Sequence, residues 1–521
     1  MKRNILFVMC DQLRYDYLSC CGHSTLQTPN IDRLAQQGVN FTRTYVPSPL
    51  CGPSRMSFYT GRSVFSHGAR YNNYPLRVDE WTLGDYLRPL GVRTVLAGKT
   101  HMAADRETIQ RLGIDPDSRA GVLMRQCGFE PHERDDGLHP AALADPDLAY
   151  NRYLREQGYE SDNSWNEFAN SAEGPNGEVL SGWYMRNAKF AARVQEEHSE
   201  TAYMTNRAMD FIRDSGNEPW CLHLSYIKPH WPYMAPAPYH DLYGPEDVQA
   251  PNRSERERRD PHPVRSAFMQ HEDSKNFARD AVRETVIPAY MGLVKQIDDH
   301  LGRLWKFLEA QGQWENTMIV FTSDHGDYLG DHWLGEKDLF HDESVRIPLL
   351  IHDPSPQADA TRGTRDSRMV EGIDLLPTFI EWLGGTPPEH RLEGASLLPL
   401  LHGTPDVTWR DYAISESDYS NRRARDFLGL APQDARATMV CTERWKGIFH
   451  PCFRPELYDL QNDPQERMDL GGDPEHEAVR RELKDRWFEW ILQRKTRVTI
   501  SEETIKNLDD PAKRGILIGY W

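Results

Sequence analysis

Apolar runs alternate with amphipathic stretches along most of this chain. The runs are short and nearly continuous in apolar residues, which is typical of strands that are buried on both faces of a parallel sheet. They occupy residues 4–9, 93–97, 220–226, 317–322 and 347–352. Helices are expected between them, beginning at Pro29 and spanning 80–90, 199–214 and 287–311. This alternation predicts an α/β fold with a large, doubly wound, mostly parallel sheet that helices flank on both faces.

The pattern changes near residue 405. Short strands are predicted at 411–416, 437–442 and 445–449, and a helix follows at 475–493. We therefore expect a catalytic domain of residues 1–404, and a C-terminal subdomain of residues 405–521 with a small antiparallel sheet, a helix and an apolar tail. The tail, residues 515–521, would be costly to expose, so it is expected to dock, for example on a neighbouring subunit.

Two long stretches of the catalytic domain lack a clear period. Residues 102–200 are rich in Asp, Gly, Pro and Asn and are expected to form an irregular insertion around the mouth of the site. Residues 236–282 are expected to form a long polar loop, which is a candidate lid. The sequence does not define the shape of either segment.

Composition and charge narrow the class of protein. The 521 residues carry a net charge of −18, which argues against a surface for nucleic acid, so an anionic substrate would need a local basic pocket. No stretch has the apolar length of a membrane span, and the apolar run near the N-terminus is too short for a signal peptide. We therefore expect a cytoplasmic protein, and the 8 cysteines, which show no metal-ligand spacing, are interpreted as reduced thiols in that compartment.

Polar residues stand at the ends of the predicted strands. Asp11 and Gln12 follow the first strand, and Asp324 and His325 follow the fourth. The C-terminal ends of parallel strands lie at one edge of the sheet, where ligand sites form in open α/β folds. Two carboxylates, an amide oxygen and an imidazole at that edge could hold a divalent cation. Taken singly, each pair could equally be a turn or a helix cap.

The sequence Cys51-Gly52-Pro53-Ser54-Arg55, with Tyr59-Thr60-Gly61-Arg62 after it, resembles the signature of the sulfatase family. Tyr59 departs from the usual leucine. A second motif, from Leu457 through Pro464 and Glu466, resembles the C-terminal motif of the same family, and the resemblance extends from Asn4 to Glu466. It implies an alkaline-phosphatase-like α/β sandwich and a formylglycine that a maturation enzyme makes from Cys51. The alternative is a buried free cysteine in a turn.

The resemblance also implies one divalent metal ion, bound by Asp11, Gln12, Asp324, His325 and residue 51. Most sulfatases have Asp-Asp and Asp-Asn where this chain has Asp-Gln and Asp-His, so the two pairs are more similar to the phosphonate monoester hydrolase branch of the superfamily. An imidazole nitrogen shifts the preference from Ca²⁺ towards Mn²⁺ without excluding Ca²⁺.

Further site residues are implied by shorter matches. Lys99 and His101 fit the Gly-Lys-x-His pattern of sulfatases. In that pattern the lysine contacts the nucleophile and the sulfate, and the histidine acts as a base. Phosphonate hydrolases lack both of these side chains. His230, in a Pro-His-x-Pro match, would contact the ester or protonate the leaving group. Lys337 would be a second substrate lysine, with a solvated surface lysine as the alternative. Two residues complete the set, Arg55 as the anchor of the formylglycine and Asn72 as a substrate contact or a simple turn residue.

These residues together predict a hydrolase of sulfate monoesters, of the aryl sulfate type, that works through a covalent sulfo-enzyme hemiacetal. The main alternative is a hydrolase of phosphonate monoesters and phosphodiesters with the same machinery, and promiscuity between the two is expected. A third reading is an unmatured binding protein that keeps the fold. The expected partners are a small anionic ester, the maturation enzyme and further copies of the chain, in a dimer or tetramer, with neither nucleic acid nor membrane.

Overall fold

A central sheet of eight strands organises the computed structural model, which describes residues 3–140, 145, 147–508, 513, 515–517 and 519. The two strand pairs that include β13 are antiparallel and the remaining pairs are parallel, which confirms the predicted mostly parallel sheet. In spatial order the strands are β14 (Thr364–Asp366), β2 (Val39–Phe41), β13 (Leu349–His352), β11 (Thr317–Ser323), β1 (Asn4–Asp11), β10 (Trp220–Pro229), β5 (Arg93–Gly98) and β7 (Glu130–Arg134).

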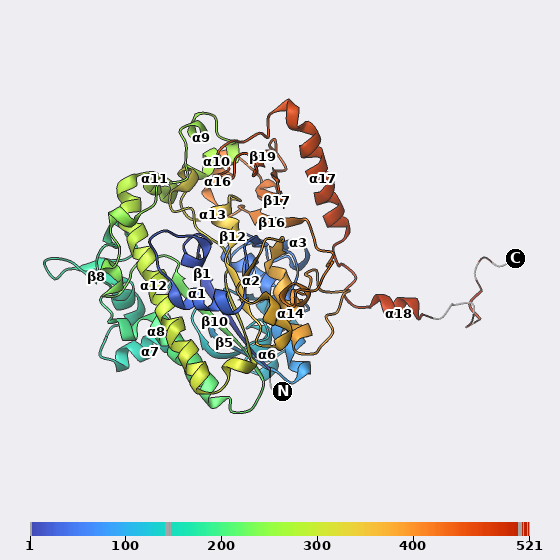
Figure 1. Cartoon of the computed structure of the whole chain (residues 1–521), viewed down its shortest axis with the longest axis horizontal. Helices are drawn as coiled ribbons and strands as arrows, with labels where there is room; N and C mark the ends of the chain where they lie inside the picture. Colours follow the sequence, from blue (N-terminus) through green and yellow to red (C-terminus); the bar gives the residue numbers. More distant parts are fainter. Residues whose placement is uncertain are drawn as a thin grey trace.

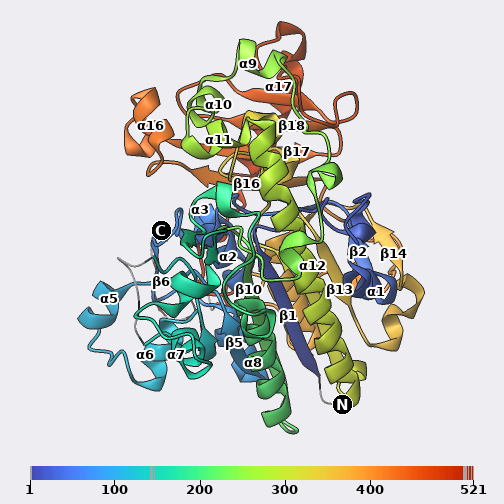
Figure 2. The same ribbon diagram turned by 90° about the vertical axis from the view of Figure 1, so that its left-hand side faces the viewer.

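Helices cover both faces of this sheet, as Figures 1 and 2 show. Every residue of β1 is buried, and its side chains alternate between two apolar clusters. One face packs against α1 (Pro29–Gln37), α8 (Glu200–Asp214) and α12 (Asp280–Ala310). The other face packs against α2 (Cys51–Thr60), α4 (Leu83–Leu87) and α14 (Leu375–Trp382). The sandwich predicted from the apolar runs is therefore confirmed.

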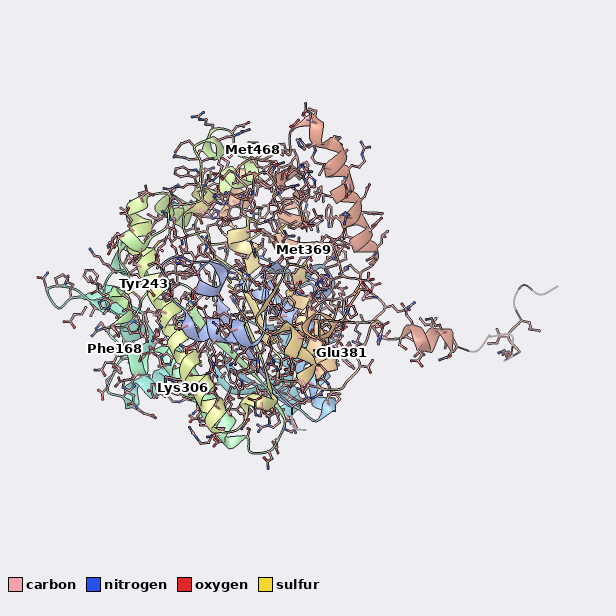
Figure 3. All side chains as sticks on the ribbon, in the orientation of Figure 1. Phe168, Tyr243, Lys306, Met369, Glu381 and Met468 are labelled. Carbon is pink, nitrogen blue, oxygen red and sulfur yellow. The ribbon has the colours of Figure 1, made fainter. Side chains whose placement is uncertain are left out.

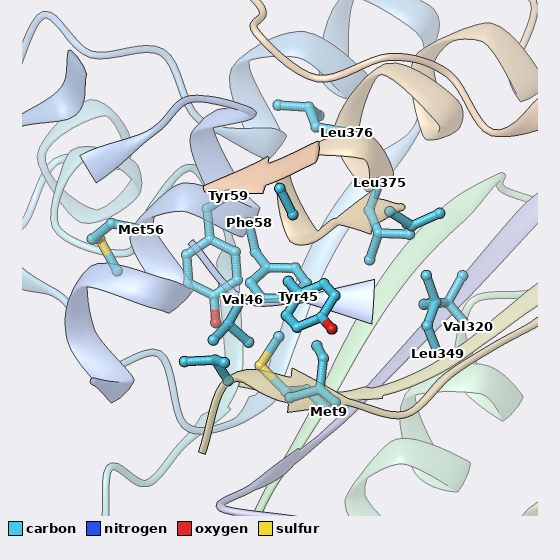
Figure 4. Packing of buried hydrophobic residues seen from close by; sticks show 14 of the residues in the cluster. Met9, Tyr45, Val46, Met56, Phe58, Tyr59, Val320, Leu349, Leu375 and Leu376 are labelled. Atoms are coloured by element: carbon cyan, nitrogen blue, oxygen red, sulfur yellow. The ribbon is translucent and has the colours of Figure 1, made fainter. Parts of the chain in front are cut away.

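Helix α2 is buried within the second cluster (Figure 4). Its side chains Met56, Phe58 and Tyr59 lie among residues of the central strands and of α14. Tyr59, the residue that departs from the usual signature, donates its hydroxyl to Nε2 of His223 at 2.9 Å, because Nδ1 of His223 donates to the carbonyl oxygen of Phe7 at 3.0 Å. A polar group in the core is therefore satisfied, and the helix that begins at Cys51 is held rigidly against the sheet.

The C-terminal part forms an antiparallel sheet of four strands, in the order β16 (Tyr412–Asp418), β17 (Arg436–Thr442), β18 (Trp445–Phe449) and β19 (Glu456–Asp459). Helix α17 (Glu477–Leu492) covers one face through Leu483 and Trp490, and the other face joins the core of the central sheet. The predicted small sheet and helix are confirmed. The fourth strand was not predicted, since β19 lies inside the Leu457 motif. The boundary at residues 404 and 405 stays a prediction.

The segment 236–282, predicted as a polar loop, is largely helical, so that prediction is wrong. It contains α9 (Arg256–Arg259), α10 (Pro263–Phe268) and α11 (Glu272–Phe277), and α12 already begins at Asp280. Val264, Phe268 and Phe277 are buried. Apolar residues spaced along short helices anchor this segment, and the many charged residues between them hide the pattern in the sequence.

The segment 102–200 is irregular as predicted, but it also supplies β7, an edge strand of the central sheet. The sequence of β7, Glu-Pro-His-Glu-Arg, has no apolar alternation because the strand is only partly buried. Side chains of both long segments, such as Phe168 and Tyr243, pack against the core (Figure 3). The predicted helix at 80–90 is shorter, comprising α4 and the 3-10 turn η2 (Arg88–Leu90), and the run 347–352 is divided between β12 and β13.

The remaining elements are short. Small sheets are formed by β12 (Arg346–Ile347), β3 (Thr44–Tyr45) and β15 (Val370–Glu371), by β4 (Pro75–Leu76) with β6 (Ala103–Ala104), and by β8 (Ser171–Glu173) with β9 (Val179–Ser181). Short helices are α3 (Val64–His67), α5 (Arg106–Arg111), α6 (Arg119–Met124), α7 (Ala149–Glu156), α13 (Asp342–Val345), α15 (Leu398–Leu401), α16 (Arg423–Leu428) and α18 (Glu502–Lys506). None of the helices in the described part of the chain is long and apolar enough to cross a membrane.

The apolar tail, residues 515–521, lies partly outside the described residues. Ile516 and Leu517 are described, and they are exposed to 55% and 62%. Helix α18, which precedes the tail, projects away from the body of the chain in Figure 1. Docking of the tail therefore stays a prediction.

Candidate active site

The candidate nucleophile is the first residue of α2. Leu50 precedes it in an extended conformation, and the helix ends at Gly61, which has a left-handed φ of 66°. The free amides and the positive end of the helix dipole therefore lie beside Cys51. The backbone N–H of Gly52 donates to Oδ1 of Asn72 at 2.8 Å, so Asn72, predicted as a substrate contact, holds the start of the nucleophile helix in this structure.

The carboxyl ends of three parallel strands bring the other groups to this helix. Asp11 ends β1, Asp324 directly follows β11, and Lys99 directly follows β5. The last residue of β5, Gly98, has a φ of +114°, and a Cβ atom there would lie 2.0 Å from the carbonyl oxygen of Ser225. Only glycine fits this close approach of β5 to β10, which directs Lys99 into the site.

Arg55 links the strand ends to one another. Its side chain is fully buried, and its Nε donates to Oδ2 of Asp324 at 2.7 Å. One terminal nitrogen donates to the carbonyl oxygen of Lys99 at 2.9 Å, and the other lies 3.3 Å from Oδ2 of Asp11. Lys99 forms a second ion pair with Asp11. The fork of one arginine therefore fixes both candidate metal-binding carboxylates.

Asp11, Cys51, Asp324 and His325 form a buried cluster whose donor atoms all lie within 4.8 Å of one another. Nδ1 of His325 lies 2.8 Å from the carbonyl oxygen of Gly326, to which it donates, so Nε2 is the nitrogen that faces the cluster and would bind a metal ion once it has lost its proton. Nε2 is 3.0 Å from Sγ of Cys51 and 3.7 Å from a carboxylate oxygen of both Asp11 and Asp324. Two carboxylates and an oriented imidazole fit a divalent transition metal ion or Ca²⁺.

Gln12 connects this cluster to Lys337. Its backbone has a φ of 65°, and its N–H donates to Oδ1 of Asp324 at 3.0 Å. Its side-chain nitrogen donates to Asp327, while its oxygen accepts a hydrogen bond of 2.9 Å from Nζ of Lys337. Lys337 is only 4% exposed, so the alternative interpretation of Lys337 as a solvated surface lysine is excluded. Glu336 takes up the insertion with a φ of 60°.

The electrostatic field at residue 51 is strongly positive. Burial by itself disfavours a thiolate, but Lys337, Lys99 and His325 together hold the pKa of the Cys51 thiol well below its ordinary value, and His101 lowers this pKa further. Burial opposes a charged His325 as well, yet Asp324 and Cys51 raise the pKa of that imidazole to about 9. The acidic chain thus contains a local group of buried cationic side chains around residue 51, which is the charge that an anionic substrate requires.

The two candidate acid–base histidines are held by different contacts. The backbone N–H of His101, which has a φ of 56°, donates to Oδ1 of Asp136 at 2.9 Å, and its Nδ1 is buried without a partner among the described residues. Nδ1 of His230 lies 2.6 Å from the carbonyl oxygen of Trp231, and its Nε2 lies 3.2 Å from Nζ of Lys337. Burial and the Lys337 charge lower the pKa of His230 to about 4, so His230 is neutral near pH 7.

Several supporting residues were not predicted. Ser54 donates its hydroxyl to the carbonyl oxygen of Asp324 at 2.7 Å, and Ser225 accepts from Arg55 at 2.7 Å. Asp136 also receives the N–H of Thr100, so it shapes the loop that carries Lys99 and His101. Asp327 accepts from Gln12 and, at 2.7 Å, from Tyr233. Ser54 and Asp327 lie within the motifs themselves, whereas Asp136 gives no signal in the sequence.

Comparison with known proteins gives matches over nearly the whole chain. The family described as "Sulfatase" matches residues 3–385, and the family described as "N-sulphoglucosamine sulphohydrolase, C-terminal" matches residues 330–493. A relative from Trinickia caryophylli, described as "Multifunctional alkaline phosphatase superfamily protein PehA", is 31% identical over 518 residues, which cover 94% of this chain and 95% of that protein. An arylsulfatase of Clostridium perfringens is 27% identical, with 90% of each chain covered.

Among solved structures, a phosphonate monoester hydrolase from Silicibacter pomeroyi superimposes with a TM-score of 0.83 and 26% identity, covering 96% of this chain and 98% of that one. The fold, the extent of the family match and the buried Asp-Cys-Asp-His cluster agree with one another. The chain is therefore a hydrolase that belongs to the sulfatase family of the alkaline phosphatase superfamily.

Proposed function

We propose that the protein hydrolyses sulfate monoesters of the aryl sulfate type, with residue 51 as a covalent nucleophile after conversion of Cys51 to formylglycine. The observation that carries this proposal is the presence of Lys99 and His101 beside residue 51. Lys99 is buried and paired with Asp11, and both side chains lower the pKa of the Cys51 thiol. Sγ of Cys51 stands at the position where the formylglycine oxygen would lie. A lysine and a base at this point favour sulfate esters.

A divalent metal ion, Ca²⁺ or Mn²⁺, would be held by Asp11, Gln12, Asp324 and His325 with residue 51, and it would supply Lewis-acid stabilisation of negative charge when bound. Arg55 keeps the two carboxylates in place whether or not the substrate is present. Lys99 and Lys337 both bring positive charge to residue 51, where the ester oxygens would bind. Charge that develops on these oxygens would therefore meet cations that are already fixed.

Lys337 is the stronger candidate for the proton donor to the leaving group. Nδ1 of His230 donates to the carbonyl oxygen of Trp231, so its Nε2 accepts from Nζ of Lys337. Burial opposes the charged ammonium, but the negative charge of Cys51 raises the pKa of Lys337, so this group carries a proton near pH 7. His230 would orient that proton, and His101, with its free Nδ1, would be the base in the release of sulfate.

Hydrolysis of phosphonate monoesters and phosphodiesters by the same residues is the second candidate function. The similarity to the phosphonate monoester hydrolases of Silicibacter pomeroyi and Agrobacterium radiobacter, with TM-scores of 0.83 and 0.79, favours it. So do Gln12 and His325, which resemble the metal-binding pairs of that branch. A tetrahedral anion of either kind would fit a pocket with this charge, so activity towards both is part of the proposal.

The deciding experiment compares kcat/KM for an aryl sulfate and an aryl phosphonate monoester. We expect the sulfate to be preferred, and Lys99→Met to lower that preference at least tenfold, because the substitution removes a cation that phosphonate hydrolases lack. Lys306→Met, on the exposed surface of α12, is the matched control and should leave both values unchanged. A parent enzyme that clearly prefers the phosphonate would overturn the sulfatase proposal in favour of the second candidate.

Conversion of Cys51 needs a separate test. Peptide mass spectrometry of protein made with and without the maturation enzyme should show the aldehyde at residue 51 only when that enzyme is present. Activity should follow the aldehyde fraction, and Cys51→Ala should be inactive while Cys452→Ala, at an exposed cysteine, stays active. If the protein has only the thiol and no turnover in the presence of the maturation enzyme, the unmatured binding protein becomes the better reading.

We also propose that the chain acts in the cytoplasm as a dimer or tetramer. The free state of the 8 cysteines, each of which lies in the described residues, supports a reducing compartment. The exposure of Ile516 and Leu517 in the tail supports contact with another copy of the chain.

A further inference from the structure

A second cluster of metal-ligating side chains lies away from residue 51, where the segment 236–282 meets the C-terminal sheet. His262 directly precedes α10, His450 directly follows β18, and Glu456 opens β19. Their exposed fractions are 0%, 9% and 4%. Figure 2 shows α10 beside the C-terminal sheet, which places this cluster between two parts of the chain that are far apart in sequence. None of these residues has a part in the proposed hydrolysis.

The hydrogen bonds of His262 fix which nitrogen carries the proton. Nε2 lies 2.9 Å from the carbonyl oxygen of Arg454 and must donate to it. Nδ1 accepts the N–H of Val264 at 3.4 Å, so it carries the lone pair. This same Nδ1 lies 3.7 Å from Oε1 of Glu456. Nδ1 of His262 and Oε1 of Glu456 therefore both direct lone pairs into the space between them, where a cation could bind.

His450 points at the same carboxylate oxygen. Its Nε2 is 3.1 Å from Oε1 of Glu456, and its Nδ1 is buried without a hydrogen-bond partner among the described residues. The other oxygen of Glu456 accepts the hydroxyl of Tyr458 at 2.9 Å. Nη1 of Arg265 donates to this hydroxyl at 3.5 Å. Two imidazole nitrogens and one carboxylate oxygen thus converge, with all three donor atoms within 4.8 Å of one another.

We propose that His262, His450 and Glu456 bind a second metal ion of the zinc type. Two imidazoles and one carboxylate are a common ligand set for Zn²⁺, and they leave the fourth position to water. His450 lines a groove of about 760 Å³ between the C-terminal sheet and α17, from which such a water can enter. The carbonyl oxygen of Arg454 and the hydroxyl of Tyr458 orient two of the ligands, as the outer contacts of metal sites do.

The ion would fasten α10 to the C-terminal sheet. It would lie between Nδ1 of His262 and Oε1 of Glu456, and it would replace the long contact with the N–H of Val264 as the partner of Nδ1. A metal that joins distant segments stabilises the folded chain by the free energy of its binding. The alternative is a trio without an ion, in which Nε2 of His450 donates to Oε1 of Glu456 and Nδ1 of His262 keeps the N–H of Val264 as its partner.

Cobalt binding tests the proposal directly. The full-length chain is freed of metal with a chelator and titrated with Co²⁺, whose visible absorption reports a tetrahedral site with nitrogen and oxygen ligands. We expect the Asp324→Asn variant, with its active-site cluster disabled, to bind one Co²⁺ with this absorption and to release it to Zn²⁺. The parent chain should bind one equivalent more. Absence of Co²⁺ absorption from both proteins would overturn the proposal, and this result does not depend on whether any His variant folds.

Variants then assign the site. His450→Ala should lose the Co²⁺ absorption, and Tyr458→Phe should weaken Co²⁺ binding by about 10- to 100-fold, because it removes only the contact that orients Glu456. His476→Ala, at a partly exposed histidine paired with Asp473, is the matched control and should bind as the parent does. Co²⁺ absorption that is unchanged in a folded His450→Ala variant would refute the assignment. Zn²⁺ should also raise the Tm of the parent and leave that of His450→Ala unchanged.

Discussion

Replacement of Arg55 by methionine tests whether one buried guanidinium organises the active site. Arg55→Met keeps most of the side-chain volume and removes the charge together with the hydrogen bonds to Asp324, Asp11, Ser225 and the backbone of Lys99. Asp11 keeps Lys99 as a partner, whereas Asp324 loses the only arginine or lysine side chain with which it pairs in the described residues. The cost should therefore come mainly from one unpaired buried carboxylate.

Breaking a buried ion pair by removing one partner costs about 3–5 kcal/mol. Since the second carboxylate remains paired, we expect Arg55→Met to lower the free energy of unfolding by about 3 kcal/mol in the presence of a chelator. This is a large part of the roughly 5–15 kcal/mol that is typical of a folded domain. Urea denaturation at pH 7, followed by tryptophan fluorescence and by circular dichroism, measures the change.

A divalent cation should partly reverse this loss. Mn²⁺ or Ca²⁺ between Asp11 and Asp324 replaces the missing positive charge, so it should stabilise Arg55→Met more than it stabilises the parent. Arg410→Met is the matched control, because Arg410 pairs at 2.6 Å with the buried Asp374, far from residue 51 in the sequence. This control should lose stability without rescue by the cation. An Arg55→Met protein that unfolds like the parent in chelator, or that gains no more from the cation, would refute the reasoning.

Three shorter predictions follow from local geometry. Gly98→Ala would place Cβ 2.0 Å from the carbonyl oxygen of Ser225 and should destabilise the chain by about 2–3 kcal/mol in urea, whereas Gly91→Ala, also at positive φ but with no atom within 4 Å, should cost less. Burial opposes a charged His332, but Glu343 and Glu257 raise its pKa to about 10. The stability that charged His332 contributes below about pH 6.5 should therefore be lost as the pH rises to 10, by about 1.4 kcal/mol per pH unit. His332→Gln should flatten this dependence, and equal slopes for the parent and the variant would contradict the prediction. Deletion of residues 515–521 should lower the solution mass in light scattering, and an unchanged mass would exclude the tail from assembly.

The parts of the fold that could be predicted from the sequence are the elements whose apolar residues form a clear continuous or periodic pattern. β1 is buried on both faces and appears as an unbroken apolar run, and the long apolar stripe of α12 is equally plain. β7 and the helices α9 to α11 do not show this signal. The first is a partly exposed edge strand, and the others bury only a few side chains each among many charges. Their structure is set by tertiary contacts that no local pattern records.

The same distinction holds for the candidate site. Residues that stand at strand ends, such as Asp11 and Asp324, could be brought together by topology alone. The position of Lys337 could not be predicted in this way, because Glu336 is an extra residue before it relative to the family motif. Only the structure shows that Glu336 adopts a positive φ, which leaves Lys337 in the site. Asp136 supports the loop of Lys99 through backbone amides, and such a contact depends on the path of the chain rather than on a motif.

The amide at residue 12 explains how a protein with a net charge of −18 keeps its pocket positive. A carboxylate there would pair with Lys337 and cancel its charge, whereas Gln12 accepts from Lys337 and donates to Asp327 without a charge of its own. Burial also raises the pKa of Glu336, the other neighbour of Lys337, to about 8, so this carboxyl is mostly protonated near pH 7. The positive charge of Lys337 is therefore left for the substrate, and Gln12→Glu should raise KM for an anionic ester more than it lowers kcat.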